Sequence, residues 1–425
     1  MTTITIEGGT GPLRGRVRVP GDKSISHRAL ILASLADGRS TLRGLSTGDD
    51  VRSTASALRL LGAEILGTEV IGGRSRLAEP VRVLDVGNSG TAIRLMAGLC
   101  AGFPWLSVLQ GDESIAQRPM GRVVEPLRAM GAEIDGRQDG RYPPLVVRGG
   151  ELKGVDHALA VPSAQVKGAL LLAGLTAEGP TTVRGSVPIR AHSEELLRLA
   201  GADVRSDPPH LVTTIHPGSL QPFVLDVPGD PSQAAFWLVA ACLVPGSEVT
   251  VEHVYVGQAR AAFIDVLIRM GADVDLEETG PTTANITARH GPTLRGTNVG
   301  GAEVPGLIDE IPVLAVAAAV AEGPTGFTDA SELRVKETDR VAATAALLDS
   351  VGAWSEPRSD GLHVAGGAPL SAGHIESFGD HRVAMAGVVA ALVAPGATRI
   401  TGWDAVRTSY PGFEDDLRHL LGGQG

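Results

Sequence analysis

Lysine is scarce in this chain, and its positions suggest anion binding. Of the 37 lysine and arginine residues only four are lysine, and three of these, Lys23, Lys167 and Lys336, fall where the sequence predicts the start of a helix. A helix amino terminus carries about +0.5 of a charge and has free N–H groups, so a cation there costs ~0.3–1 kcal/mol unless an anion binds beside it. This placement predicts an enzyme that acts on small, multiply charged anions.

Other polar groups stand at the same predicted helix starts. Ser24 is expected to cap the first helix, with Lys23 and Arg28 near an anion docked there. Gly90, in the segment GNSGTAIR, would allow the backbone to approach a ligand closely. The run 163–165, Ser-Ala-Gln, offers a hydroxyl, an amide and open N–H groups. Such starts also serve ordinary capping and packing, so each alone is a weak signal.

Two more basic residues could join the third of these starts. Lys167 follows the run 163–165 by two residues, and the two together suit a phosphate. Arg190, in SVPIRAHSEE, is a natural bidentate partner for the same phosphate, although a solvated arginine is an equally good interpretation. Arg118 precedes a proline and is expected in a loop, where the sequence alone assigns it no role.

The segment 336–340, Lys-Glu-Thr-Asp-Arg, is the sharpest motif. Lys336 and Arg340 are expected four residues apart on one helix face, where like charges repel unless something neutralises them. Glu337 could tune either group for proton transfer. The alternative is an ordinary charged and exposed helix face.

Carboxylates introduce the last two polar helix starts. Asp309 and Glu310 stand directly before a buried apolar run, where one of them could cap the helix or accept a hydroxyl proton. Asp380 is expected to cap the final apolar helix, which begins with His381 and Arg382. Arg382 would again oppose the helix dipole, and His381 alone is more often structural than catalytic.

The composition bounds the class of protein. A chain of 425 residues with 43% hydrophobic and 20% charged residues predicts a soluble protein of two or more domains. The net charge of −11 argues against general nucleic-acid binding. Cys100 and Cys242 fall in apolar patterns and are expected in the core. The sequence carries no targeting segment, membrane span, metal-ligand spacing or nucleotide motif, so we expect a cytoplasmic protein without a cofactor or metal.

A repeated unit organises these helix starts. The pattern Leu-x-x-x-Gly-Ala, with looser copies toward the end, places glycines at 62, 131, 201, 271, 352 and 422, which are 69, 70, 70, 81 and 70 residues apart. Each glycine fits the position that ends a helix in a left-handed conformation. An apolar helix and a Thr/Val-rich strand precede each copy, which predicts six units in two groups of three. A binding solenoid is disfavoured because its repeats usually run 20–50 residues.

Together these motifs carry a family resemblance over essentially the whole chain. The segments GDKSISHRAL, GNSGTAIRLMAGL, SAQVKGALLLAGL, LRVKETDR and GDHRVAMA resemble those of the 5-enolpyruvylshikimate-3-phosphate (EPSP) synthase family. The resemblance implies a two-domain inverse α/β barrel of six βαβαββ repeats, three per domain, with the active site in the interdomain cleft. Residues 21–227 would form the N-terminal domain, and residues 1–20 with 228–425 the C-terminal domain.

The resemblance also implies a reaction. The family transfers the enolpyruvyl group of phosphoenolpyruvate to the 5-hydroxyl of shikimate 3-phosphate, through a tetrahedral intermediate and without a metal. We therefore expect these two small molecules as partners, glyphosate as an inhibitor, no nucleic-acid or membrane partner, and a monomer.

Site residues carry over by position in the matching motifs. The implied catalytic residues are Asp309, Glu337, Lys23 and Lys336. The implied shikimate 3-phosphate contacts are Lys23, Ser24, Arg28, Ser163, Ala164, Gln165, Arg190, Asp309 and Lys336. The implied phosphoenolpyruvate contacts are Lys23, Asn88, Gly90, Arg118, Gln165, Arg340 and Arg382. Whether Asp309, Glu310 or Glu337 is the base stays open.

Three departures from the family pattern stand out, and one of them is Leu95, which follows Arg94 where many members have proline. Ala164 replaces a second serine of many members, so its contact can only be through the backbone. Thr408 stands where some members have a lysine before the aromatic-proline pair, and Arg407 is one residue away. Whether Arg407 substitutes for that lysine is open.

Two other functions compete with this one. A sister enolpyruvyl transferase that acts on UDP-N-acetylglucosamine has the same fold, but it carries a reactive cysteine in a stretch that corresponds to 112–119, which here contains none. A non-catalytic sugar-phosphate sensor would be expected to lack Asp309, Lys336 or Glu337, and all three are present.

Overall fold

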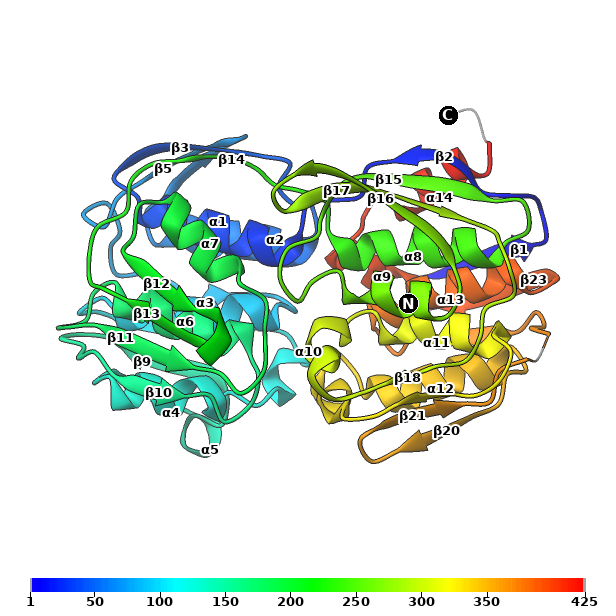
Figure 1. Cartoon of the computed structure of the whole chain (residues 1–425). Coiled ribbons are helices and arrows are strands. Elements are labelled where there is room, and N and C mark those ends of the chain that lie inside the picture. Colours follow the sequence, from blue (N-terminus) through cyan, green and yellow to red (C-terminus); the bar gives the residue numbers. More distant parts are fainter. Residues whose placement is uncertain (1, 368, 423–425) are drawn as a thin grey trace. The chain divides into compact units, whose positions relative to one another are not determined.

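A computed structural model describes residues 2–367 and 369–422. It divides into two compact units, residues 21–227, here the N-terminal unit, and residues 1–20 with 228–425, here the C-terminal unit (Figure 1). The divisions fall inside the Pro/Gly segments 19–22 and 227–230.

The N-terminal unit consists of three copies of one βαβαββ motif. Its helices are α1 (Lys23–Leu35), α2 (Asp49–Leu60), α3 (Gly90–Ala101), α4 (Gly121–Ala129), α5 (Arg137–Gly140), α6 (Ala164–Gly174) and α7 (His192–Leu199). Its strands are β3 (Gly38–Arg43), β4 (Glu64–Leu66), β5 (Glu69–Gly72), β6 (Leu84–Asp85), β7 (Leu106–Gln110), β8 (Glu133–Gly136), β9 (Tyr142–Arg148), β10 (Asp156–Ala158), β11 (Thr181–Arg184), β12 (Val204–Asp207), β13 (Val212–Ile215) and β14 (Val224–Asp226). They form three sheets in the orders β14-β3-β5-β4, β6-β7-β9-β8 and β10-β11-β13-β12.

The C-terminal unit follows the same plan, except that one of its three sheets has three strands. Its helices are α8 (Pro231–Leu243), α9 (Ala262–Arg269), α10 (Val304–Leu307), α11 (Ile311–Val320), α12 (Arg340–Ser350), α13 (His381–Val393) and α14 (Phe413–Leu420). Its strands are β1 (Thr3–Gly8), β2 (Arg14–Val17), β15 (Glu248–Tyr255), β16 (Asp273–Gly280), β17 (Thr283–Arg289), β18 (Asn298–Val299), β19 (Thr325–Phe327), β20 (Ser355–Arg358), β21 (Gly361–Val364), β22 (His374–Glu376) and β23 (Gly396–Thr401). Their sheet orders are β16-β17-β15-β2, β18-β19-β21-β20 and β1-β23-β22.

The pairing rule is the same in all six sheets. Each sheet contains one parallel pair, such as β6 with β7 and β18 with β19, and in the pairs β14 with β3 and β2 with β15 the two strands come from distant parts of the chain. The remaining pairs are antiparallel. The βαβαββ repeat that the family resemblance implied is therefore confirmed.

The repeated Leu-x-x-x-Gly-Ala signature ends one helix in every copy. All six glycines adopt positive φ, between +81° and +110°, two residues beyond the helix. In the first five copies the following alanine donates its N–H to the leucine carbonyl, as from Ala63 to Leu58 at 3.0 Å. This is the Schellman closure, and it explains why leucine, glycine and alanine recur together.

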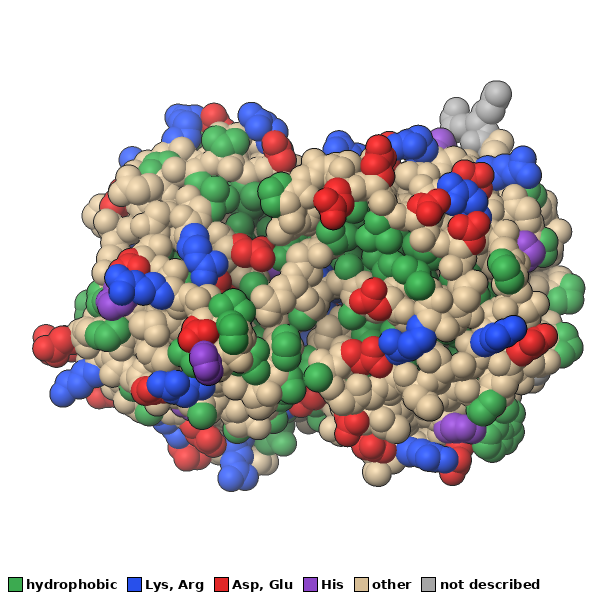
Figure 2. Space-filling model, in the orientation of Figure 1, with side chains coloured by type: hydrophobic (Ala, Val, Ile, Leu, Met, Phe, Trp, Pro, Cys, Tyr) green, Lys and Arg blue, Asp and Glu red, His purple; other side chains and the backbone are tan. Residues whose placement is uncertain are grey.

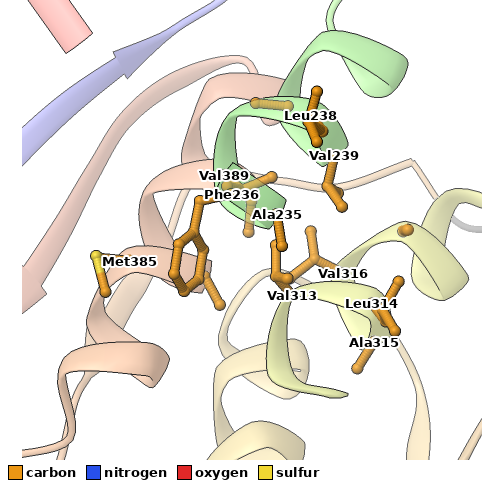
Figure 3. Packing of buried hydrophobic residues seen from close by; sticks show 14 of the residues in the cluster. Ala235, Phe236, Leu238, Val239, Val313, Leu314, Ala315, Val316, Met385 and Val389 are labelled. Atoms are coloured by element: carbon orange, nitrogen blue, oxygen red, sulfur yellow. The ribbon is translucent and has the colours of Figure 1, made fainter. Parts of the chain in front are cut away.

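Buried helices fill the interior of each unit. In the C-terminal unit α8, α11 and α13 pack on one another, with Phe236, Val313 and Met385 in their shared core (Figure 3). Figure 1 shows strands β15, β16 and β17 on one side of these helices and β18, β20 and β21 on the other. In the N-terminal unit α3 packs on both α1 and α6. Beyond its first turn each of these helices is buried on nearly every face, and any charged residues it has lie within its first two turns.

The chain's first two strands belong to the C-terminal unit. β1 pairs antiparallel with β23 along residues 3–8 and 396–401. β2 pairs parallel with β15. The sheet that contains β23 therefore combines the two ends of the chain.

Surface charges are mixed in sign. Figure 2 shows acidic and basic side chains interspersed over the visible face of the described residues. Within the part of the chain that the structure describes, no helix combines the length and apolar character that crossing a bilayer requires.

We expect the contact between α3 and α6 to tolerate no side chain at Gly98. A Cβ there would lie 2.3 Å from the carbonyl oxygen of Ala169. Gly98→Ala should therefore lower the free energy of unfolding by at least about 1–3 kcal/mol in urea titrations. Gly121→Ala, at the start of α4, is the matched control, because its Cβ would meet no atom closer than 3.5 Å. Equal stability of the two variants would contradict the prediction.

Candidate functional site

In the N-terminal unit the amino ends of α1, α3 and α6 meet. Arg28 of α1 connects them to α7, because its guanidinium donates to the Ala164 carbonyl at 3.0 Å and to the Ser193 hydroxyl at 2.7 Å. Arg94 of α3 donates to the side-chain oxygen of Gln165 at 2.6 Å. Three positive helix ends therefore face one region, which favours anions.

Lys23 is the first residue of α1, and its charge is already compensated. The ammonium lies 2.8 Å from Asp50 at the start of α2, and both side chains are largely buried. Asp22, and not Ser24 as predicted, caps α1 by accepting the N–H of Ile25 at 2.9 Å. Ser24 instead contributes its carbonyl to Arg28.

The start of α3 brings together the residues implied for phosphoenolpyruvate in this unit. Arg118 donates to the side-chain oxygen of Asn88 at 3.2 Å. Asn88 in turn donates to Asp112 at 2.6 Å. A Cβ on Gly90 would lie 2.6 Å from a terminal nitrogen of Arg118, so the guanidinium lies directly over this glycine.

The start of α6 presents the residues implied for phosphate. Ser163 caps the helix by accepting the N–H of Val166 at 3.3 Å. Both polar atoms of the Gln165 amide have partners. Its oxygen accepts from Arg94, and its nitrogen donates to the Thr91 hydroxyl at 2.9 Å. Arg190 is half-buried in the segment that leads into α7, which packs on α6.

Lys167 does not reach toward a ligand as predicted. It is buried one turn into α6, and its ammonium is paired with Glu194 of α7. Glu194 also accepts the Thr213 hydroxyl at 3.3 Å. The structure thus pairs Lys167 with a carboxylate of α7, because the fourth position of α6 faces that helix.

The C-terminal unit gathers two further cations and three carboxylates around Arg340. Arg340 is 1% exposed and donates to Asp380 at 2.7 Å, to Asp309 at 3.1 Å and to Glu337. Arg382 also contacts Asp309, at 3.4 Å. Burial alone would lower the pKa of Arg340, but the three carboxylates raise it above its usual value. Arg340 is therefore a permanent cation.

Lys336 lies beside this group but not on the predicted helix. The helix α12 begins at Arg340 with Asp339 as its cap, and Lys336 has an extended backbone just after the 3-10 turn η4 (Ser331–Val335). The predicted pair of like charges on one helix face is therefore wrong. Burial lowers the pKa of the Lys336 ammonium, and nearby carboxylates, led by Asp309, oppose the shift without cancelling it. Such an amine can exchange a proton more readily than an ordinary lysine.

Asp380 caps α13 as predicted, accepting the N–H of Arg382 at 2.8 Å. His381 is buried at the first position of this helix. Glu310 differs from Asp309 in being enclosed, with contacts to Ser232 and Arg260. Arg407 is exposed in η5 (Trp403–Thr408), and the neighbouring Thr408 hydroxyl donates to the Ala405 carbonyl.

Sequence reasoning missed the partners of the predicted residues. Asp50, Arg94, Ser193 and Arg260 carry polar contacts that hold the site, and none was assigned to it. Each lies on an element distant in sequence from its partner, so no local pattern indicates the pairing.

Cations at helix amino ends, some of them compensated by carboxylates, can bind small anions, and Lys336, whose pKa is lowered, can help to move protons. This fold and these residues define the class of protein as an enzyme for small anionic substrates. A family model described as EPSP synthase (3-phosphoshikimate 1-carboxyvinyltransferase) matches residues 8–417. The chain belongs to this family.

Individual relatives agree with the family match. The 3-phosphoshikimate 1-carboxyvinyltransferase of Synechococcus sp. (strain JA-3-3Ab) is 49% identical over 421 residues, which cover 96% of this chain and 95% of the relative. That of Gloeobacter violaceus is 50% identical, with 96% of each chain covered. The structure of EPSP synthase from Acinetobacter baumannii matches with a TM-score of 0.86 at 38% identity, covering 98% of both chains. The enolpyruvyl transferase NikO from Streptomyces tendae shares the fold, with a TM-score of 0.80 at 21% identity and coverage of 98% of this chain and 96% of NikO.

His27 should make the stability of the protein depend on pH. It is fully buried between the hydroxyls of Thr54, at 2.7 Å, and Ser89, at 3.3 Å, and burial followed by Lys23 and Arg28 lowers its pKa well below 6.5. Folded His27 stays neutral while unfolded His27 gains a proton below pH 6.5. The free energy of unfolding is therefore unaffected by His27 above that pH. Below it, this free energy falls as the pH decreases, by up to about 1.4 kcal/mol per pH unit.

Urea unfolding of the wild type and of His27→Gln between about pH 7.5 and 5.5 measures this slope. The substitution should flatten it. His210→Gln is the control, because His210 is exposed beside Asp207. An unchanged slope in His27→Gln would contradict the assignment.

Proposed function

We propose that the protein transfers the enolpyruvyl group of phosphoenolpyruvate to the 5-hydroxyl of shikimate 3-phosphate, giving 5-enolpyruvylshikimate 3-phosphate and phosphate. The observation that carries the proposal is the group around Asp309, in which one carboxylate is held by Arg340 and Arg382 beside Glu337 and Lys336. Such a group combines fixed cations for anions with groups that can accept and return protons.

In the N-terminal unit, we assign the shikimate 3-phosphate contacts to the starts of α1 and α6. Ser163, the Ala164 backbone and Gln165 would bind the phosphate with Arg190, because a capped helix start offers N–H groups and Arg190 a planar fork. Lys23, Ser24 and Arg28 would complete these contacts. To contact substrate, the Lys23 ammonium must either leave Asp50 or bind Asp50 and the substrate at the same time.

In the same unit, we assign phosphoenolpyruvate contacts to the start of α3. Asn88, Gly90 and Arg118 are adjacent there, and Lys23 and Gln165 lie on the neighbouring helix starts. In the C-terminal unit the corresponding contacts are Arg340 and Arg382. Both guanidiniums are almost fully buried, so each charge is weakly screened by solvent.

The chemistry divides into an addition and an elimination. Asp309 takes the proton of the 5-hydroxyl, and Lys336 orients the ring. The 5-oxygen then bonds to C2 of phosphoenolpyruvate while the methylene carbon gains a proton. The methyl group of the tetrahedral intermediate then loses a proton as the C2–phosphate bond breaks. We assign these two transfers at carbon to Glu337 and Lys23, which are ionisable and beside fixed partners.

Two observations favour this reaction over its rivals. Burial raises the pKa of the Cys100 thiol to about 11 and that of Cys242 to about 12, so neither supplies the reactive thiolate of the enolpyruvyl transferase that acts on UDP-N-acetylglucosamine. The retained carboxylates and lysine around Arg340 disfavour a non-catalytic sensor. We further propose a cytoplasmic monomer that glyphosate inhibits, in keeping with two free, buried cysteines and the family resemblance.

Phosphate release from phosphoenolpyruvate tests the function, with shikimate 3-phosphate or UDP-N-acetylglucosamine as acceptor. We expect release only with shikimate 3-phosphate. Release only with the nucleotide sugar would keep the fold and overturn the substrate. Folded protein that is inactive with both acceptors would revive the sensor.

Asp309→Asn should lower kcat by about 10²- to 10⁴-fold, because the amide cannot accept the hydroxyl proton. Shikimate 3-phosphate binding, measured by equilibrium titration, should change far less, since the N-terminal unit supplies most of the phosphate contacts. Equal losses in binding and turnover would make Asp309 a positioning residue instead.

Gly90→Ala should weaken phosphoenolpyruvate binding and glyphosate inhibition together. The added Cβ would displace the Arg118 guanidinium from 2.6 Å, and overpacking of about 1–3 kcal/mol corresponds to roughly 5- to 150-fold. KM for phosphoenolpyruvate and the inhibition constant of glyphosate measure the effect. Gly150→Ala, whose Cβ meets nothing within 4 Å, is the control. Unchanged glyphosate inhibition would show that Gly90 does not contact the phosphoenolpyruvate site.

A further inference from the structure

A second buried charge cluster lies in the C-terminal unit, and the reaction as assigned above does not use it. Its members are Arg260, in the segment between β15 and α9, Asp230 and Ser232 at the start of α8, and Glu310, which directly follows Asp309 in the chain. All four residues are at most 2% exposed. A cluster so deeply enclosed makes no direct contact with bulk solvent and acts through what it holds in place.

Arg260 uses its planar fork to connect two carboxylates. One terminal nitrogen donates to Asp230, which caps α8. The other donates to Glu310 at 3.0 Å and to the Ser232 hydroxyl at 2.8 Å. Ser232 donates in turn to the same oxygen of Glu310. The starts of α8 and α11 are therefore joined by charge-assisted hydrogen bonds, which are stronger than neutral ones.

Arg260 compensates the charge of the buried Glu310 carboxylate. The second oxygen of this carboxylate has no hydrogen-bond partner among residues 2–367 and 369–422. A buried carboxylate without a paired cation would gain a proton or draw in water, and either change would move the side chain. Arg260 is the one cation that the structure pairs with Glu310 in the described chain.

Glu310 fixes the backbone that carries Asp309. Its N–H donates to the Leu307 carbonyl at 2.8 Å, and its own carbonyl accepts the N–H of Leu314 at 3.0 Å. The two neighbouring carboxylates have different partners, because Asp309 contacts Arg340 and Arg382 while Glu310 contacts Arg260. A shift of Glu310 would therefore rotate or displace Asp309 relative to both of its arginines.

We infer that Arg260 and Glu310 are positioning residues for Asp309, an inference that rests on the proposed role of Asp309 as the base. Glu310 is not itself the base, because its carboxylate is enclosed and engaged by Arg260. A displacement of about 1 Å in a reacting group can cost about 10²-fold in rate. The pair acts on turnover by this route, without touching either substrate.

The test is a double-mutant cycle on kcat with Glu310→Gln and Asp309→Asn. Glu310→Gln keeps the shape of the side chain and removes its charge, so kcat should fall about 10- to 100-fold while KM for each substrate changes less than about threefold. In the Asp309→Asn background the same change should have almost no further effect. Near-additivity is the rule for independent residues, so this loss of effect is diagnostic.

Two further variants make the test independent of folding problems. Ser232→Ala removes one hydrogen bond to Glu310 without altering charge, and should produce a smaller fall in kcat in the same direction. Glu303→Gln is the matched control, since it also removes one arginine pair, Arg269–Glu303 at 3.0 Å, in the same unit. It should leave kcat unchanged. Urea unfolding of every variant verifies that the compared proteins are folded.

The outcomes separate the inference from the function on which it rests. If Glu310→Gln lowers kcat by the same factor in the wild-type protein and in the Asp309→Asn variant, the pair does not act through Asp309 and the inference is overturned. The same holds if Glu310→Gln and Ser232→Ala both fold and retain full kcat. If instead Asp309→Asn alone retains full kcat, the proposed base is wrong and the inference falls with it.

Discussion

Both units depend on one arrangement, the meeting of three buried helices at their amino ends. Apolar helices that pack on one another without solvent have nowhere to place polar groups except at their ends. The contacts of Arg28 with Ala164 and of Arg94 with Gln165 show that the amino ends meet in the N-terminal unit. Those of Ser232 with Glu310 and of Arg382 with Asp309 show the same in the C-terminal unit. Each convergence concentrates positive potential, which must be offset by carboxylates, by a ligand or by both.

The two units solve this problem differently. At the helix starts of the N-terminal unit the arginines donate to neutral oxygens, such as carbonyls, hydroxyls and amides, whereas the two lysines pair with carboxylates, Lys23 with Asp50 and Lys167 with Glu194. In the C-terminal unit the arginines donate to carboxylates, with Arg340 shared among Asp380, Asp309 and Glu337. The first arrangement directs the N–H donors of arginines and helix starts toward one region, which favours an anion. The second keeps charge balanced and offers carboxylates that can accept protons, which suits phosphate binding in one unit and proton transfer in the other.

Local signals in the sequence predicted where helices begin and end, but they did not predict which charged side chains pair with one another. The glycines that end helices and the polar residues that begin the apolar helices could be predicted, because each depends on a few neighbouring residues. Lys336 was misplaced because Asp339, a strong cap, starts the helix at Arg340 and leaves Lys336 outside it. Lys167 was assigned to phosphate because nothing near it in sequence indicates Glu194, 27 residues away. The link from Arg260 to Asp230 and Glu310 spans 30 and 50 residues and is fixed by packing alone.

The pairing of β1 with β23 has a consequence for how the chain is made. Residues 21–227 are one continuous segment, so every sheet of the N-terminal unit can be completed once the ribosome has released that stretch. The sheet that contains β1 cannot form completely until residue 401 has emerged from the ribosome, because β1 pairs with β23. During synthesis the first strand must therefore remain unpaired while almost the whole polypeptide is translated. When domains fold as units during synthesis, a strand that is still unpaired can pair with wrong partners. The length of β1, six residues, limits this risk.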